Sequence, residues 1–62
     1  MNYEVINGVL NLNSKGLTEV PDEVWELKNV KTLVLNNNQL TTVSPGIANL
    51  GNSLTRLYLT GN

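Results

Sequence analysis

The chain has 62 residues, with four Lys or Arg residues against five Asp or Glu residues, and it contains neither cysteine nor histidine. This length holds one domain with a small core, and the missing residue types exclude a scaffold stabilised by disulfides or by the usual zinc ligands. With a net charge of -1 and no basic stripe, we expect no nucleic acid partner. Because the usual metal ligands are missing and no phosphate-binding loop is present, we also expect no metal and no cofactor.

The first segment predicts a hairpin. Asn7-Gly8 lies between the apolar runs Tyr3–Ile6 and Val9–Leu12, and an Asn-Gly pair in this setting is the strongest short-range signal for a two-residue turn. We therefore expect residues 1–6 to form an antiparallel cap strand on the edge of the sheet. The alternative is a disordered leader.

An internal repeat occupies the rest of the chain. A shift of 23 residues superposes six pairs of apolar positions: Leu10 and Leu33, Leu12 and Leu35, Leu17 and Leu40, Val20 and Val43, Val24 and Ile47, Leu27 and Leu50. A further shift of 24 carries four positions of the second copy onto Leu54, Leu57, Leu59 and Asn62. The chain thus divides into repeat 1 (residues 7–29), repeat 2 (30–53) and a truncated repeat 3 (54–62).

Each repeat predicts one coil, made of a strand and a helical turn. Leu33 and Leu35 alternate with their neighbours in the period of a strand that buries one face. Val24 and Leu27 lie one helical turn apart, and Ser44-Pro45 supplies an N-cap followed by a proline at the first helical position. We expect three parallel strands, each connected to the next through a short helical or 3-10 turn.

The second repeat reads L-x-x-L-x-L-x-x-N-x-L from Val30 to Leu40, with valine at the first position, and in this spacing the chain resembles the leucine-rich repeat family over nearly its whole length. The resemblance implies an α/β fold, a right-handed solenoid with a short parallel sheet and helical or 3-10 turns on its convex side. It also implies that Asn38 and Asn62 form a structural asparagine ladder that satisfies backbone groups between coils. Lys15 occupies this position in repeat 1, so we expect the ladder to begin at the second coil.

The resemblance further implies that a protein partner binds the concave face formed by the strands. The variable positions between the leucines stack into three columns: Val9, Thr32 and Arg56; Asn11, Val34 and Tyr58; Asn13, Asn36 and Thr60. Arg56 and Tyr58 are the strongest candidates, because Arg and Tyr are enriched among interface anchors. The predicted partner-binding set is Thr32, Val34, Asn36, Arg56, Tyr58 and Thr60. The alternative is that these are ordinary solvated strand residues, as we expect for the asparagines.

No residue pattern predicts an enzyme. The three serines have no histidine to act as a general base, and an Asp22 and Glu26 pair would lie on an exposed turn without a pocket. The acidic residues Glu19, Asp22, Glu23 and Glu26 mostly precede or open a helical turn, where they favour the helix dipole. Trp25 is expected to pack on the convex side or at the edge of its coil.

Two architectures stay open because residues 54–62 stop before another helical turn. One is the N-terminal part of a longer array that binds a protein. The other is an architectural unit that self-associates through its exposed third strand and coil. The sequence shows no signal peptide, membrane span or cysteine, so we expect no membrane interaction and a cytoplasmic location.

Overall fold

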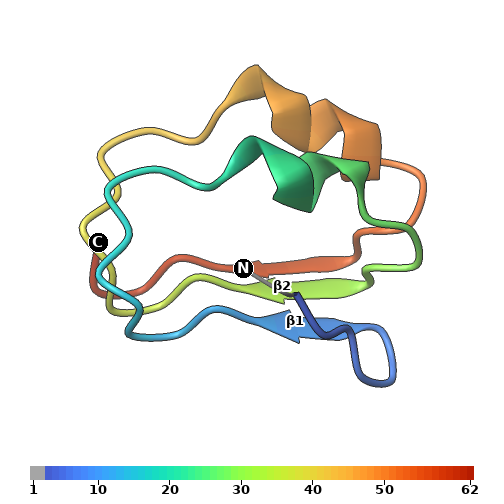
Figure 1. The fold of residues 1–62 in the computed structure, drawn as a ribbon, viewed down its shortest axis with the longest axis horizontal. Helices are drawn as coiled ribbons and strands as arrows, with labels where there is room; N and C mark the ends of the chain where they lie inside the picture. Colours follow the sequence, from blue (N-terminus) through green and yellow to red (C-terminus); the bar gives the residue numbers. More distant parts are fainter. Residues whose placement is uncertain (1–2) are drawn as a thin grey trace.

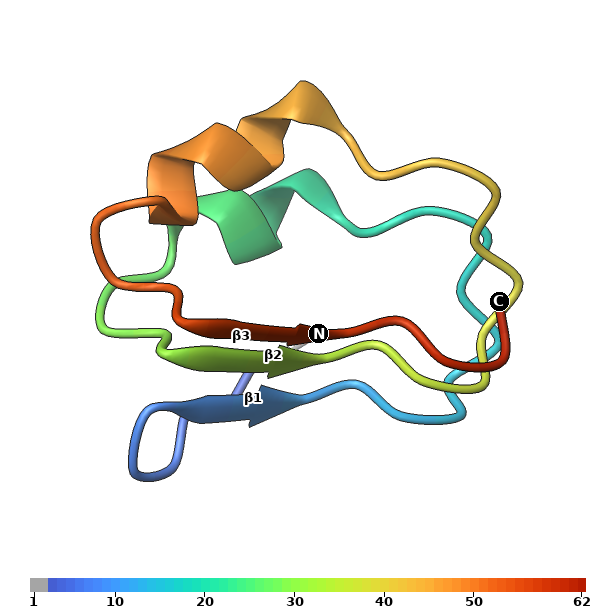
Figure 2. The same ribbon diagram turned by 180° about the vertical axis from the view of Figure 1, so that it is seen from behind.

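The computed structural model describes residues 3–62 and arranges them as a three-stranded sheet with a layer of short helices beside it (Figure 1). The elements in chain order are β1 (Val9–Asn11), η1 (Asp22–Glu26), β2 (Thr32–Val34), η2 (Pro45–Leu50) and β3 (Arg56–Tyr58). The 3-10 helices η1 and η2 pack side by side, and Figure 2 shows the three strands as neighbours in the order of the chain.

The strands are parallel and pair in the register of the sequence repeat. Leu10 lies opposite Leu33, which lies opposite Leu57. The backbone hydrogen bonds recur one coil later: the Leu12 N–H donates to the Val34 carbonyl at 2.8 Å, and the Leu35 N–H donates to the Tyr58 carbonyl at 2.9 Å. The predicted short parallel sheet is therefore confirmed.

Both connections contain 3-10 turns, as the sequence predicts. The N–H of Val24 donates to the Pro21 carbonyl at 3.0 Å, which forms the first turn of η1. In η2 the Ser44 hydroxyl oxygen accepts from the Gly46 N–H at 3.1 Å, and Pro45 occupies the first helical position. Serine and proline thus begin this turn by satisfying one free donor and by omitting another.

The core fills the space between the sheet and the 3-10 helices. Its buried apolar members are Leu10, Leu12, Val20, Val24, Trp25, Val30, Leu33, Leu35, Leu40 and Leu50. Leu33 and Leu35 of repeat 2 are 0% exposed, whereas the equivalent Leu57 and Leu59 of repeat 3 are each 37% exposed. This gradient arises because a repeat buries its apolar row only between two neighbouring coils.

Trp25 lies at the edge of the first coil and faces the second coil. Its side chain is only 5% exposed, and a methyl group added at Gly46 would come within 2.5 Å of the Trp25 Cδ1 atom. The indole therefore fills the space between η1 and η2 at the edge of the coil. The alternative prediction, that Trp25 covers the convex side, is wrong.

The Asn7-Gly8 turn forms as predicted, but the cap strand is reduced to a single antiparallel bridge between Ile6 and Val9. Asn7 and Gly8 have φ angles of 53° and 80°, which suit a type I′ hairpin. The expectation of a strand over residues 1–6 is wrong for residues 3–5, while residues 1 and 2 lie outside the described residues. The pairing ends early because Tyr3 and Val5 pack against the core cluster.

Tyr3 brings the N-terminal segment close to the helical layer. Desolvation, and secondarily the Glu23 carboxylate of η1, raise the pKa of the Tyr3 hydroxyl above its ordinary value of 10.0. Both effects disfavour the charged phenolate of this half-buried ring.

Candidate functional site

The strands present one continuous surface that points away from the core, which we call the outer sheet face. Residues that alternate with the inward leucines form it, and the Ile6–Val9 bridge adds Ile6 to its edge. The register places its members in two rows across the strands: Ile6, Val9, Thr32 and Arg56; Asn11, Val34 and Tyr58. Backbone hydrogen bonds from Ser14 to Asn36 and from Asn37 to Thr60 continue this register past the strand ends to a third row, Asn13, Asn36 and Thr60.

Arg56 and Tyr58 form the polar corner of this face, on β3. Both are exposed, Tyr58 at 40%, and Arg56 is the only charged residue between Thr32 and Asn62. Their neighbours Thr32 and Val34 on β2 are half-buried. The Arg56 guanidinium and the Tyr58 phenol thus lie beside the apolar side chain of Val34. This corner can offer a partner both charge-assisted hydrogen bonds and apolar contact.

The third row of the outer sheet face is engaged in local hydrogen bonds. The Asn36 side-chain oxygen accepts from the Thr60 N–H at 2.8 Å. The Asn37 side-chain amide donates to the Asn13 oxygen at 3.2 Å, and the Asn13 N–H donates to the Asn11 side chain at 2.9 Å. These amides hold the strand ends, which leaves them fewer free groups for a partner than Arg56 and Tyr58 have.

Asn38 makes five hydrogen bonds from a side chain that is 7% exposed. Its amide nitrogen donates to the carbonyls of Leu12 at 3.0 Å, Leu35 at 2.9 Å and Asn36 at 3.2 Å. Its oxygen accepts from the Lys15 N–H at 2.9 Å and the Leu17 N–H at 3.1 Å. One carboxamide therefore satisfies backbone groups of the first and second coils where the chain leaves the sheet.

Asn62 repeats this arrangement one coil later. Its amide nitrogen donates to the carbonyls of Leu35 and Leu59, both at 2.9 Å, and its oxygen accepts from the Leu40 N–H at 3.1 Å. The Leu35 carbonyl accepts from both Asn38 and Asn62, so the two side chains are linked through one backbone group.

Ile6 is the residue of the outer sheet face that sequence reasoning missed. Its side chain is 57% exposed although it is large and apolar. The signal was present in the sequence: a two-residue turn at Asn7-Gly8 puts Ile6 directly opposite Val9, and opposite residues of a hairpin share a face. Together with Val9, Ile6 gives this face an apolar edge on the side of β1, across the sheet from Arg56.

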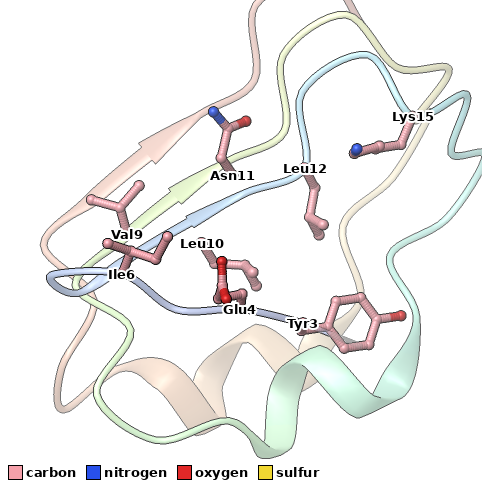
Figure 3. Close-up of a pocket in the computed structure, with 8 residues that line it drawn as sticks. All are labelled: Tyr3, Glu4, Ile6, Val9, Leu10, Asn11, Leu12 and Lys15. Carbon is pink, nitrogen blue, oxygen red and sulfur yellow. The ribbon is translucent and has the colours of Figure 1, made fainter. Parts of the chain in front are cut away.

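A cavity of about 500 Å³ lies between the N-terminal segment and β1, at the edge of the sheet (Figure 3). Figure 3 shows the Leu10 and Leu12 side chains directed toward this segment, while Val9 and Asn11 point to the opposite side of the strand. The lining is mostly apolar and consists of Tyr3, Glu4, Ile6, Val9, Leu10, Asn11, Leu12 and Lys15.

Metal-ligating side chains do not cluster in this structure. Within residues 3–62, no group of three His, Cys, Asp or Glu side chains is placed to hold a metal ion. The same residues include no helix with the length and apolar character needed to cross a membrane.

Comparison with known proteins agrees with this geometry. The family model of the leucine rich repeat matches residues 9–62, which is most of the chain. Neither the curated proteins nor the solved structures gave a match. Because the matched residues include all three parallel strands and both 3-10 turns, the chain belongs to the leucine-rich repeat family.

Proposed function

We propose that the chain is a non-enzymatic protein–protein interaction module, part of a longer right-handed leucine-rich repeat solenoid, whose partner binds the outer sheet face as its concave surface. Leucine-rich repeats generally serve as protein interaction modules. The observation that carries the proposal for this chain is the placement of Arg56 and Tyr58 next to each other on an exposed strand.

The chemistry of the face indicates the kind of partner surface that would fit it. Arg56 supplies a positive charge and the face has no carboxylate, so a partner with an Asp or Glu side chain at that corner gains a charge-assisted hydrogen bond. Val34, next to Tyr58, and the pair Ile6 and Val9, across the sheet from Arg56, offer apolar area for aliphatic or aromatic side chains of the partner. Thr32, Asn36 and Thr60 complete the proposed set at the centre and far row of the face.

This proposal predicts that ligands selected against the chain depend on β3. Random peptides displayed on phage would be enriched on the immobilised 62-residue chain and then tested against variants. We expect Arg56→Ala and Tyr58→Ala each to weaken binding by about tenfold or more, because truncating an anchor residue costs about 1 to 2 kcal/mol or more. The matched controls are Glu19→Ala and Lys28→Ala, which lie outside the outer sheet face. The proposal is refuted if the selected peptides bind the Arg56→Ala and Tyr58→Ala variants as tightly as the unmodified chain, or if only the control substitutions weaken their binding.

Self-association through the last coil is a second candidate function. Leu57 and Leu59 are each 37% exposed, and a groove of about 220 Å³ next to Leu59 is lined by Leu40, Thr41, Thr42, Val43 and Asn62. The side chains that line this groove are uncharged, so the apolar surface of Leu40, Val43 and Leu59 could pack against a second copy.

A charge in the groove is expected to prevent this association. Light scattering of the 62-residue chain over a concentration series would show a rising mass, and Thr41→Lys would keep the mass at that of the monomer, because two copies would then bury two lysines. Thr18 occupies the equivalent position of the first coil and is also exposed, so Thr18→Lys is the matched control. A constant monomeric mass for the unmodified chain would rule out this candidate.

The cytoplasmic location stays a prediction.

A further inference from the structure

Asn7 differs from the other asparagines of this chain in the residue that follows it. The chain has eleven asparagines, and Asn7 is the only one followed by glycine. Asn7 is exposed, and the Gly8 N–H donates to no other described residue. We propose that Asn7 is a site of spontaneous deamidation and isoaspartate formation that opens the hairpin at the edge of the sheet.

The chemistry requires only this dipeptide and water. The Gly8 backbone nitrogen attacks the carboxamide carbon of Asn7 and forms a nitrogen–carbon bond. The bond from this carbon to the side-chain nitrogen breaks, and ammonia leaves with the proton that the Gly8 N–H has lost. Water then opens the resulting succinimide at either carbonyl, which gives an aspartyl or an isoaspartyl residue. Because glycine has no Cβ, its nitrogen reaches the carboxamide carbon without steric hindrance.

The hairpin does little to prevent ring closure. Closure requires rotation about the Asn7 Cα–C bond. Apart from the two bonds that the Gly8 carbonyl accepts from the next coil, the turn is held by one pair of backbone hydrogen bonds, between Ile6 and Val9 at 3.0 and 2.9 Å. Terminal segments with so few backbone bonds open at a low free-energy cost.

At both asparagines that precede serine, a backbone hydrogen bond opposes the same reaction. Asn13 and Asn52 both precede serine, a small residue, but the Ser14 N–H donates to the Asn36 carbonyl and the Ser53 N–H donates to the Leu50 carbonyl, both at 3.0 Å. The amides that follow Asn11, Asn36 and Asn38 are likewise donated to backbone carbonyls. A nitrogen held in such a bond cannot turn toward the preceding side chain.

Isoaspartate at Asn7 would disturb the start of the parallel sheet. The Gly8 carbonyl accepts from the Lys31 N–H at 2.7 Å and from the Thr32 N–H at 2.9 Å. An isoaspartyl linkage adds a methylene group to the backbone of the turn, which displaces this carbonyl from both donors. It also places a carboxylate beside Ile6, at the edge of the outer sheet face.

The test is incubation of the 62-residue chain at mildly alkaline pH, followed by peptide mapping with mass spectrometry. When about half of Asn7 has been converted to a separable aspartyl and isoaspartyl pair, we expect Asn13 and Asn52 to be unchanged. In the isolated isoaspartyl form, the Lys31 and Thr32 amides should exchange hydrogen faster. Asn7→Gly retains a turn that accepts positive φ and should give no product at that position, and Asn7→Asp adds the charge without the extra methylene and should leave both amides protected.

The same incubation in concentrated urea separates the effect of the fold from that of the sequence. Unfolding should accelerate reaction at Asn13 and Asn52 far more than at Asn7. The proposal is overturned if Asn13 or Asn52 reacts as fast as Asn7 in the folded chain, or if urea leaves their relative rates unchanged.

Discussion

Replacing Asn38 with alanine is expected to lower the free energy of unfolding by on the order of 3 kcal/mol or more, since each buried polar group left without a partner costs about 1 to 3 kcal/mol. The substitution removes all five hydrogen bonds of a 7% exposed side chain. The Leu12 carbonyl and the Lys15 and Leu17 N–H groups then lose their carboxamide partner. Because a core of this size supplies only about 3 to 5 kcal/mol, the variant should retain at most about 2 kcal/mol of stability.

Asn62→Ala is the matched control, because it removes the same side chain from the equivalent position of the next coil. Asn62 is exposed, so water replaces its three hydrogen bonds, and we expect a loss of only about 0.5 to 1.5 kcal/mol. Urea unfolding of both variants, followed by circular dichroism, gives the comparison. Equal and small losses would show that burial of the Asn38 carboxamide does not stabilise the fold.

The register of the sheet could be predicted from the sequence because strand alternation and repeat length constrain each other. A shift of 23 or 24 residues allows only one alignment in which Leu33 and Leu35 both meet leucines of the neighbouring copies, and a slip of one residue would turn them to solvent. The same alignment placed Arg56 and Tyr58 on the outer face. The two asparagine positions followed from the family resemblance, although their individual hydrogen bonds did not.

Features that depend on packing between coils could not be predicted in this way. Periodicity in the first copy assigned Val24 and Leu27 to the inward side and left Trp25 between two positions, since the space for the indole comes from Gly46 in another repeat. The cap strand was overestimated for a related reason. The apolar alternation of Tyr3 and Val5 is the same in a strand that pairs with the sheet edge and in an unpaired segment that packs against the core. The structure shows the second arrangement for Val5.

Gly46→Ala is expected to destabilise the chain by about 1 to 3 kcal/mol, the usual cost of forcing an extra carbon atom into a filled core. The new Cβ would lie 2.5 Å from Trp25 Cδ1 and 2.9 Å from Trp25 Cγ, which are atoms at the base of a ring held in place by burial. Without this contact the opposite sign is expected, because replacing glycine with alanine at an unstrained position stabilises proteins by about 0.4 to 1 kcal/mol.

A double-mutant cycle with Trp25→Leu separates these two effects. Leucine removes the ring that Gly46 accommodates, together with a buried indole N–H that has no hydrogen-bond partner among the described residues. Trp25→Leu alone should be destabilising because the smaller side chain leaves a cavity. In that background, however, Gly46→Ala should become neutral or stabilising, which corresponds to a coupling of about 1 to 3 kcal/mol between residues in direct contact. If Gly46→Ala costs the same in both backgrounds, glycine is required there by the backbone of η2 and not by the indole, and the contact between the two coils would need another explanation.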